Sequence, residues 1–341
     1  MTGGLGFIGS NVSIELLQAG YEVLIIDSLI NSFQQRLKNI ESIIYSNKIY
    51  KNSKIHFRQA DISNRKLLNS IFYEFNKRDN PIKAVIHCAG LKSVGESVVD
   101  PLRYWDANIN ATLTLISIMK IHNCHNLVFS SSASIYKRNN GEKVTEESPL
   151  QAENPYGNTK LAIEKILEDL YNSQPNLWRI ANLRYFNPAG TNENGFLGDI
   201  PKLQPKNLFP LILQVANKKL DHLSIFGKDW PTKDGTCIRD YIHIRDLSKA
   251  HLATLEFLLE NPPKILSLNI GTGNGSSVLE VLNTFMKVNK INIPYKFKSR
   301  RKGDTPYLVA CNDLALKLIK WSPEYDLEDI CLDSFKGLKN K

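Results

Sequence analysis

The sequence predicts an α/β protein in which a doubly wound parallel sheet is followed by a smaller C-terminal domain. In the first half, short β-branched apolar runs alternate with longer segments of helical spacing, which is typical of parallel sheets whose ligands bind at the carboxyl ends of the strands. After about residue 180 this alternation gives way to loops rich in Gly, Pro and Asn. We therefore expect domains at residues 1–180 and 181–341, with parts of 236–260 packing back on the first.

The individual elements follow from these patterns. Strands are expected at residues 21–26, 84–87 and 127–129, which are short and apolar. Helices are expected around residues 8–19, 64–76, 101–123 and 155–173, where apolar residues recur at helical spacing.

Composition excludes several classes of protein. The chain has 341 residues, of which 42% are hydrophobic, enough for a sizeable core. Although the formal net charge is +9, the Lys and Arg residues are dispersed, so we expect no nucleic-acid partner. The five cysteines are scattered without a C-x-x-C pair, which indicates reduced thiols and no metal site. No apolar run reaches the roughly 18 residues of a membrane span, and no secretion signal precedes the first glycine. We expect no membrane contact and a cytoplasmic location.

A glycine pattern at the start of the chain predicts a dinucleotide site. Gly3, Gly6 and Gly9 open a helix with Phe7 and Ile8 between them, and such a turn lets backbone N–H groups approach a pyrophosphate. Asp27 ends the next expected strand, where a carboxylate accepts ribose hydroxyls and repels a 2′-phosphate. These residues predict NAD rather than NADP on a Rossmann-type sheet. The alternative is an ordinary glycine turn with Asp27 as a turn residue.

The start of the chain departs from this pattern. A Rossmann-type sheet needs an apolar central strand before the first glycine, and only Met1 and Thr2 precede Gly3. The first strand is therefore expected to be missing, which would leave its two neighbours without pairing partners. We hypothesise that the start is truncated or misassigned. Mass spectrometry of the native N-terminus tests this, and a native chain beginning at Met1 would refute it.

Tyr156 and Lys160 are candidates for acid/base chemistry. They are four residues apart and so lie on one helical face, and a nearby cation helps to bring a phenol into the working range of pKa. Two other pairs have the same spacing but no serine-ended strand before them, namely Tyr50/Lys54 and Tyr73/Lys77. Ser132 closes a serine run after the strand at 127–129, so its hydroxyl can bind the substrate oxygen that Tyr156 deprotonates. The alternative for this run is a turn or cap.

Together these motifs resemble the extended short-chain dehydrogenase/reductase family, and the resemblance covers essentially the whole chain. It is carried by the glycine run, Asp27, Asp61-Ile62, Cys88-Ala89-Gly90, Ser132 and Tyr156-x-x-x-Lys160. Four further runs, in order, are similar to UDP-galactose 4-epimerases within that family: residues 90–97, 184–188, 226–236 in part, and 239–243.

This resemblance implies a redox mechanism. Tyr156 would take the proton from the sugar 4-hydroxyl while hydride passes from C4 to the nicotinamide, and the 4-keto sugar would turn over and receive the hydride on its other face. Lys160 would hold the nicotinamide ribose and lower the pKa of Tyr156, while Ser132 would position the oxygen. NAD would stay bound as a prosthetic group.

The resemblance also implies the remaining site residues and the assembly. Further cofactor contacts would come from Asn31, Ser32, Asp61, Ile62, Ala89, Gly90, Lys92, Asn108 and Phe186. The UDP-sugar would contact Asn187, Asn207, Leu208, Ser224, Ile225, Phe226, Arg239, Arg301, Asp304 and Leu308, besides Ser132 and Tyr156. The two arginines suit a diphosphate. Relatives pair as homodimers through helices corresponding to 101–123 and 155–173.

Some positions depart from the family pattern and leave alternatives open. Ala107 stands where some members have a cofactor-contacting asparagine, although Asn108 is adjacent. The intermediate size of Leu308 leaves acceptance of N-acetylated sugars open. Ala133 and Ser134 occupy the places where dehydratases have their acid and base, which argues against dehydration. Epimerases of UDP-xylose or UDP-glucuronate, and a non-catalytic NAD-binding relative, remain as alternatives.

Overall fold

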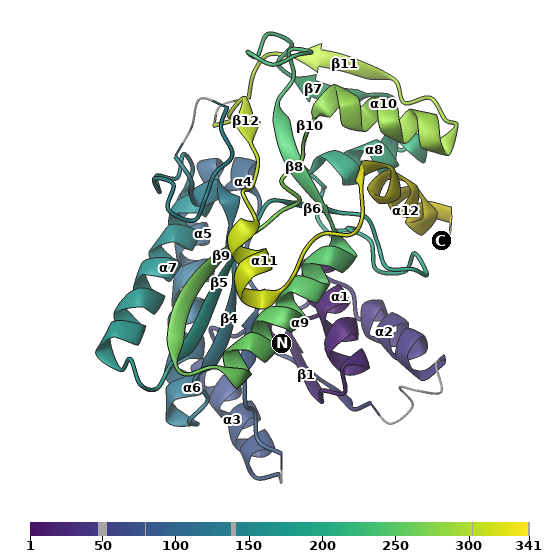
Figure 1. Ribbon diagram of the computed structural model, residues 1–341. Helices are drawn as coiled ribbons and strands as arrows, with labels where there is room; N and C mark the ends of the chain where they lie inside the picture. Colours follow the sequence, from purple (N-terminus) through teal and green to yellow (C-terminus); the bar gives the residue numbers. More distant parts are fainter. Residues whose placement is uncertain (47–52, 79, 138–140, 302, 340–341) are drawn as a thin grey trace.

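The computed structural model describes residues 1–46, 53–78, 80–137, 141–301 and 303–339. A parallel sheet lies at the centre of the larger part of the molecule (Figure 1). On one side β1 (Val23–Asp27) pairs with β2 (Ile55–Gln59). On the other, the strand order is β3 (Val85–His87), β4 (Asn126–Ser132), β5 (Arg179–Tyr185) and β9 (Lys264–Ile270), all parallel. This architecture confirms the predicted α/β fold.

The place of the first strand is taken by Met1 and Thr2. Thr2 forms parallel bridges with both Ile26 on β1 and His87 on β3, and its N–H donates to the carbonyl of Ile86 at 3.0 Å. The expectation that both neighbours would be left without a partner is therefore wrong at the carboxyl ends of these strands. Backbone hydrogen bonds there join the two halves of the sheet around the glycine turn.

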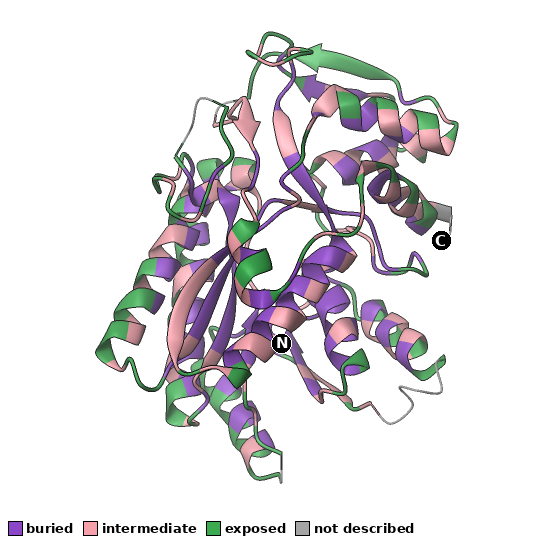
Figure 2. Ribbon diagram, viewed as in Figure 1, coloured by how far each residue is buried: buried purple, intermediate pink, exposed green. Residues whose placement is uncertain are grey.

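Helices cover both faces of the sheet because alternate strand residues point to opposite sides. Val128 belongs to the core shared with α1 (Phe7–Gln18), α2 (Gln35–Ser46), α9 (Ile244–Glu260) and α11 (Asp313–Ile319). Leu127 and Phe129 belong to the core shared with α3 (Arg65–Asn76), α6 (Ala111–Ile121) and α7 (Pro155–Ser173). Figure 2 shows the strands buried between helices whose outer faces are exposed.

The predicted helices at 8–19, 64–76 and 155–173 are confirmed as α1, α3 and α7. The predicted helix at 101–123 is interrupted. It consists of α5 (Pro101–Trp105), a π-helical turn (Asp106–Asn110) and α6, and the short α4 (Val94–Val99) precedes it.

The smaller part is built on short strands around β8 (Ile238–His243). Its partners are β6 (Asn187–Ala189), β10 (Gly275–Ser277) and β12 (Tyr307–Leu308), while β7 (Leu223–Phe226) pairs with β11 (Tyr295–Lys298). Helices α8 (Leu208–Ala216), α10 (Val278–Asn289) and α12 (Leu327–Lys339) share a core with these strands.

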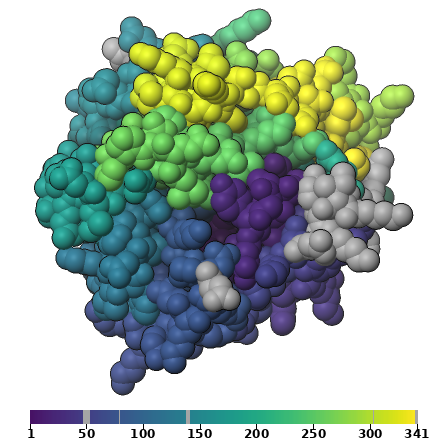
Figure 3. Space-filling view, turned by 60° about the horizontal axis from the view of Figure 1, so that its bottom comes forward, coloured from purple at the N-terminus to yellow at the C-terminus, as the bar shows by residue number. Residues whose placement is uncertain are grey.

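Segments from the second half of the sequence complete the first sheet. The expected boundary at residue 180 falls within β5, and β9 pairs with β5 as the edge strand. Helix α9 packs against α1, and Figure 3 shows the green of this region lying beside the purple N-terminal segment. At its carboxyl end, β5 leads directly into β6, which pairs with β8 of the smaller part.

Candidate active site

The glycine turn before α1 brings three backbone segments into close contact. Gly3 has φ +64°, and a Cβ on it would lie 2.7 Å from the backbone nitrogen of Ala89. A Cβ on Gly9 would lie 2.3 Å from the carbonyl oxygen of Gly3. Gly6 is the N-cap of α1 and no side chain caps it. The turn therefore leaves the helix N-terminus open to an anion, which fits the pyrophosphate of NAD.

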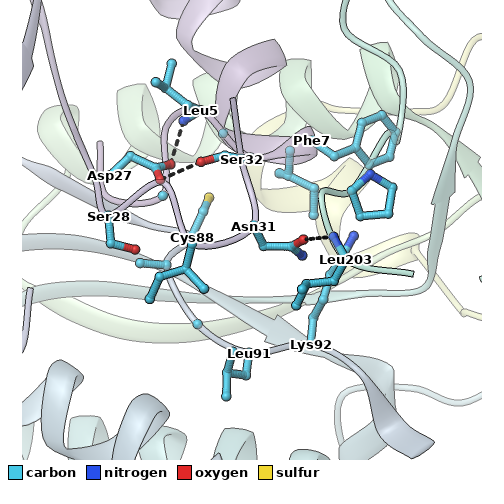
Figure 4. A pocket seen from close by; sticks show the side chains of 18 of the residues that line it. Leu5, Phe7, Asp27, Ser28, Asn31, Ser32, Cys88, Leu91, Lys92 and Leu203 are labelled. Carbon is cyan, nitrogen blue, oxygen red and sulfur yellow. Dashed lines mark hydrogen bonds between the residues drawn. The ribbon is translucent and has the colours of Figure 1, made fainter. Parts of the chain in front are cut away.

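A cavity of about 570 Å³ opens beside this turn (Figure 4). Most of the residues expected to bind the cofactor line it, together with one residue expected to bind the sugar nucleotide. They are Gly3, Gly6, Phe7, Ile8, Gly9, Asp27, Asn31, Ser32, Asp61, Ile62, Ala89, Gly90, Lys92 and Asn207. The sequence-based assignments from five separate segments thus meet in one cavity.

Asp27 organises the loop that forms one end of this cavity. Its carboxylate accepts hydrogen bonds from the N–H groups of Leu5 and Leu29, both at 2.9 Å, and from the hydroxyl of Ser32 at 2.7 Å. Figure 4 shows Asp27, Leu5 and Ser32 joined in this way. Oδ1 already accepts from Leu29 and Ser32, whereas Oδ2 accepts only from Leu5 among the described residues, so Oδ2 can still accept from a ribose hydroxyl.

A segment from the second half of the chain closes the opposite side. Lys92 forms an ion pair with Asp199 at 3.3 Å, and the N–H of Leu203 donates to the side chain of Asn31 at 3.0 Å (Figure 4). Arg36, which is buried, donates to the carbonyl of Gly198. No sequence pattern marks this cover, because it depends on contacts between distant residues. It is lined by Asp199, Ile200, Pro201, Leu203, Gln204, Pro205 and Lys206.

Helix α7 carries the expected acid/base pair. The helix begins after Asn154, whose side chain accepts from the N–H of Gly157 at 2.9 Å. A Cβ on Gly157 would lie 2.6 Å from the carbonyl oxygen of Ser134, so this glycine lets α7 approach the end of β4. The short distance brings Tyr156 within hydrogen-bonding reach of Ser132.

Lys160 lies at the centre of this arrangement. Its ammonium donates to the carbonyl of Ser130 at 2.7 Å, and a Cβ on Gly90 would lie 3.9 Å from it. The helix therefore places the ammonium beside a residue that lines the cofactor cavity. Burial lowers the pKa of Lys160 to about 8.

Tyr156 is half-buried at the start of α7. Burial raises its pKa above the ordinary value, and the hydrogen bond with Ser132 opposes that rise. Lys160 lies 5.9 Å from the centre of the phenol ring. The expected reduction of the Tyr156 pKa is therefore not produced by the protein groups alone, and a cationic nicotinamide beside the phenol would act in the required direction.

The two other Tyr/Lys spacings differ from this pair. Tyr73 is exposed on α3, with the ammonium of Lys77 above its ring at 4.4 Å. Tyr50 lies outside the described residues.

Asn108 does not line the cavity, whereas Ala107 does. Its buried amide donates to Thr159 at 3.0 Å and accepts from the N–H of Leu91 at 2.8 Å. In this structure, Asn108 thus holds the loop after β3 against α7.

Several of the residues expected around the sugar nucleotide contact one another in the smaller part. Arg239 on β8 is the cross-strand partner of Leu308 on β12. Arg301 pairs with Asp304 at 3.0 Å, and its guanidinium lies 5.4 Å from the centre of the Phe226 ring. These contacts bring together residues from three regions that are distant in sequence.

Leu308 connects this group to the end of β4. It packs on a small cluster that contains Phe186, Tyr136 and Ala133, and Ala133 follows Ser132 directly. The other expected contacts are Asn187 at the start of β6, Leu208 at the start of α8, and Ser224 and Ile225 on β7. Ile225 is buried in the core.

The described ranges contain neither a metal-binding cluster nor a membrane span. Within them, no group of three His, Cys, Asp or Glu side chains is placed to hold a metal ion. Nor does any helix there have the length and apolar character needed to cross a membrane.

Comparison with known proteins gives consistent matches. Residues 1–271 match the NAD dependent epimerase/dehydratase family. The chain is 43% identical to a UDP-glucose 4-epimerase of Bacillus subtilis, over 98% of this chain and 95% of the relative. It is 44% identical to a UDP-glucose 4-epimerase of Dictyostelium discoideum, over 98% and 94%. The structure also superposes on UDP-glucose 4-epimerase from Bifidobacterium longum in complex with NAD+ and UDP, with TM-score 0.92, 39% identity and 99% and 97% coverage. The chain therefore belongs to the NAD dependent epimerase/dehydratase family.

Proposed function

We propose that this protein interconverts UDP-glucose and UDP-galactose by NAD-dependent inversion at sugar C4 through a transient 4-keto sugar. The observation that carries this proposal is the position of Tyr156 and Lys160. Both lie on α7, where Tyr156 is within hydrogen-bonding reach of Ser132, and the ammonium of Lys160 contacts Ser130 and lies beside Gly90, which lines the cavity that the glycine turn opens. The Bacillus subtilis and Dictyostelium discoideum relatives are both named for this activity.

In this proposal Tyr156 is the base for the 4-hydroxyl. Ser132 donates a hydrogen bond to the same oxygen and holds it against the phenol. When bound, NAD supplies the hydride acceptor and a positive charge beside Tyr156. The proton then returns from the phenol to the oxygen once the sugar has presented its other face.

The remaining expected contacts complete the proposed site. Lys160 would bind the nicotinamide ribose, while the residues that line the cavity would hold the rest of NAD, most of them from the 1–180 half. Arg239 and Arg301 bind the diphosphate as bidentate donors, and Leu308 bounds the sugar pocket within the 181–341 half. The similar epimerase from Bifidobacterium longum was solved in complex with both NAD+ and UDP, which supports the same pair of ligands here.

Isotope retention tests the reaction. UDP-galactose carrying deuterium at C4 is predicted to give UDP-glucose that keeps the deuterium at C4, because the same hydride returns within one active site. Mass spectrometry of the product measures it. Replacement of the label by solvent hydrogen would contradict internal hydride return, and failure to form UDP-glucose in an NAD-loaded preparation would contradict the activity itself.

We also propose that the protein is a homodimer. The supporting observation is an apolar patch along α4 to α6, beside α7, in which Val99 and Leu102 are 85% and 80% exposed. Trp105 and Leu113 are exposed on the same stretch. Exposed apolar side chains grouped along neighbouring helices in this way are typical of a protein interface.

A cytoplasmic location is proposed as well. The hydroxyl of Ser130 donates to the sulfur of Cys88 at 3.0 Å, and Cys88 lines the cofactor cavity. A thiol built into the site in this way suits a reducing compartment. Imaging of the protein expressed in its native cell from the native gene tests this, and a signal confined to an oxidising compartment would contradict it.

A further inference from the structure

Helix α7 carries a third ionisable side chain, Glu164, to which the proposed function gives no role. Glu164 follows Lys160 by four residues, as Lys160 follows Tyr156, so the three side chains share one face of the helix. Glu164 is 6% exposed. A carboxylate at this depth needs hydrogen bonds or a counter-charge.

The counter-charge is Arg184 on β5. Its Nη2 lies 2.8 Å from Glu164 Oε2, and its Nε donates to Glu164 Oε1 at 3.1 Å, so the pair is bidentate. The hydroxyl of Ser131 also donates to Glu164. Because Ser131 precedes Ser132 on β4, the carboxylate ties the strand that carries the expected substrate hydroxyl to the helix that carries the expected base.

The pair also reaches the wall of the expected sugar pocket. Arg184 Nη1 donates to the hydroxyl of Tyr136 at 3.0 Å and to the carbonyl of Glu146 at 2.9 Å. The hydroxyl of Tyr136 then donates to Asn269 at 2.6 Å. Tyr136 belongs to the cluster on which Leu308 packs.

The charges around Lys160 come from several elements. The titratable groups that act on it or contact it are His87 and Cys88 at the end of β3, and Tyr156 and Glu164 on α7. Those around Arg184 are Glu164, Tyr136 and Glu146. Burial raises the pKa of the Cys88 thiol and lowers that of His87, so both are uncharged near neutral pH. Glu164 is then the carboxylate in this set that favours protonated Lys160.

We propose that Glu164, paired with Arg184, is a positioning residue for the epimerase reaction. Its carboxylate fixes Ser131, and through it the backbone of Ser132, against α7, and its charge holds Lys160 in the protonated form. The inference rests on the catalytic roles proposed above for Tyr156 and Lys160.

Glu164→Gln separates charge from shape, because the amide oxygen can still accept from Ser131. The alkaline limb of the kcat profile is predicted to move to lower pH by about one unit, since Lys160 loses its proton earlier. KM for UDP-galactose is predicted to change by less than about threefold, because no substrate contact is removed. An alkaline limb at the wild-type pH in a folded, NAD-loaded Glu164→Gln protein would overturn the proposal.

A second variant covers the case in which Glu164→Gln does not fold. Glu164→Gln can leave Arg184 as an unpaired buried charge, whereas Glu164→Gln combined with Arg184→Met leaves none. Because it also removes the positive charge of Arg184, which opposes that of Glu164 at Lys160, this double variant is predicted to keep its alkaline limb closer to the wild-type position than is predicted for Glu164→Gln. A limb displaced at least as far as is predicted for Glu164→Gln would overturn the role given to the charge of Glu164.

Ser131→Ala tests the part of the proposal in which Glu164 fixes Ser131 against α7, because it removes one hydrogen bond and keeps the charge of Glu164. It is predicted to lower kcat by about tenfold with the alkaline limb in place. An unchanged kcat would refute the positioning role of Ser131.

The matched control is Asp246→Asn. Asp246 is another buried carboxylate, which accepts from the N–H groups of Glu324 and Tyr325, each at 3.1 Å. Its loss is predicted to lower the melting temperature without moving the pH profile, so an equal shift in this variant would contradict a specific role for Glu164.

Tyr156→Phe is measured in parallel. If it keeps full activity, the proposed function of the pair fails; if it is inactive while Glu164→Gln keeps the wild-type limb, only this inference fails.

Discussion

Lys160 is a buried lysine, and burial changes the pH range in which it is charged. Its ammonium is enclosed by protein and donates to a backbone carbonyl, and burial lowers its pKa from 10.5 to about 8. The charge that the proposed chemistry needs is therefore present below this pH and is lost as the pH rises through it.

We therefore predict that kcat falls on the alkaline side of pH about 8, by about tenfold for each further unit, as a single ionisation requires. Steady-state turnover of UDP-galactose over a range of pH measures it. Lys160→Met is expected to lose activity at every pH, whereas Lys77→Met, at the surface Tyr/Lys pair, is expected to keep the wild-type profile. A wild-type profile that stays flat for about two units above this pKa would contradict the assignment.

Leu308 is the residue whose size we expect to bear on sugar specificity. It packs on the cluster with Phe186 beside the end of β4. Leu308→Ala is predicted to raise kcat/KM for UDP-N-acetylgalactosamine relative to UDP-galactose by about tenfold, because removing apolar atoms makes room for the acetamido group. Comparison of the two substrates measures this ratio. Leu332→Ala, at an exposed leucine of α12, serves as control, and an unchanged ratio in Leu308→Ala would show that this side chain does not bound the pocket.

At the scale of elements, the turn before α1 depends on backbone contacts that only glycine permits. Gly9→Ala is predicted to lower the free energy of unfolding by about 2 kcal/mol and to weaken NAD retention, because the backbone of Gly3 and Gly4 stands in the way of the new methyl group. Thermal denaturation and the NAD content of the purified protein measure the two effects.

Gly95→Ala is the matched control for this prediction. Gly95 lies in α4 and a Cβ on it would meet nothing within 4 Å. The change is predicted to be neutral or to stabilise the protein by up to about 1 kcal/mol. Equal losses of stability in both variants would contradict the argument from close approach.

The sequence predicted some elements closely and others only in part. Helix α7 has the predicted bounds, because Asn154 and Pro155 are local start signals. The predicted helix at 101–123 contains a π-helical turn in which Asn108 is buried. No local propensity marks that turn, since the partners of Asn108 at Leu91 and Thr159 are distant in sequence.

In the candidate site, too, local patterns could be predicted from the sequence, whereas contacts between distant residues could not. The glycine turn and the Tyr156/Lys160 spacing are local patterns and could be found in the sequence. The cover from Asp199 to Lys206 could not, because its position depends on pairing with Lys92 and Asn31. Arg36 was missed for the same reason, since its partners are Ser10 and Gly198.

At the scale of the whole molecule, the exposed patch on α4 to α6 bears on assembly. Leu102→Glu is predicted to convert a dimer to a monomer, because a charge would be buried at the interface. Light scattering coupled to size exclusion measures the mass. Leu316→Glu introduces the same charge at an exposed leucine of α11 and is expected to leave the dimer intact. A wild-type protein of monomer mass would contradict the proposed homodimer.

In the proposed function, Tyr156 performs the proton transfer of a UDP-sugar epimerase. The most direct test of this claim is the rate of conversion of UDP-galactose to UDP-glucose by NAD-loaded wild-type protein, Tyr156→Phe and Tyr73→Phe. We predict turnover by the wild type, a loss of about 100-fold or more in Tyr156→Phe, and wild-type turnover in Tyr73→Phe. Turnover by Tyr156→Phe at the wild-type rate would contradict the claim.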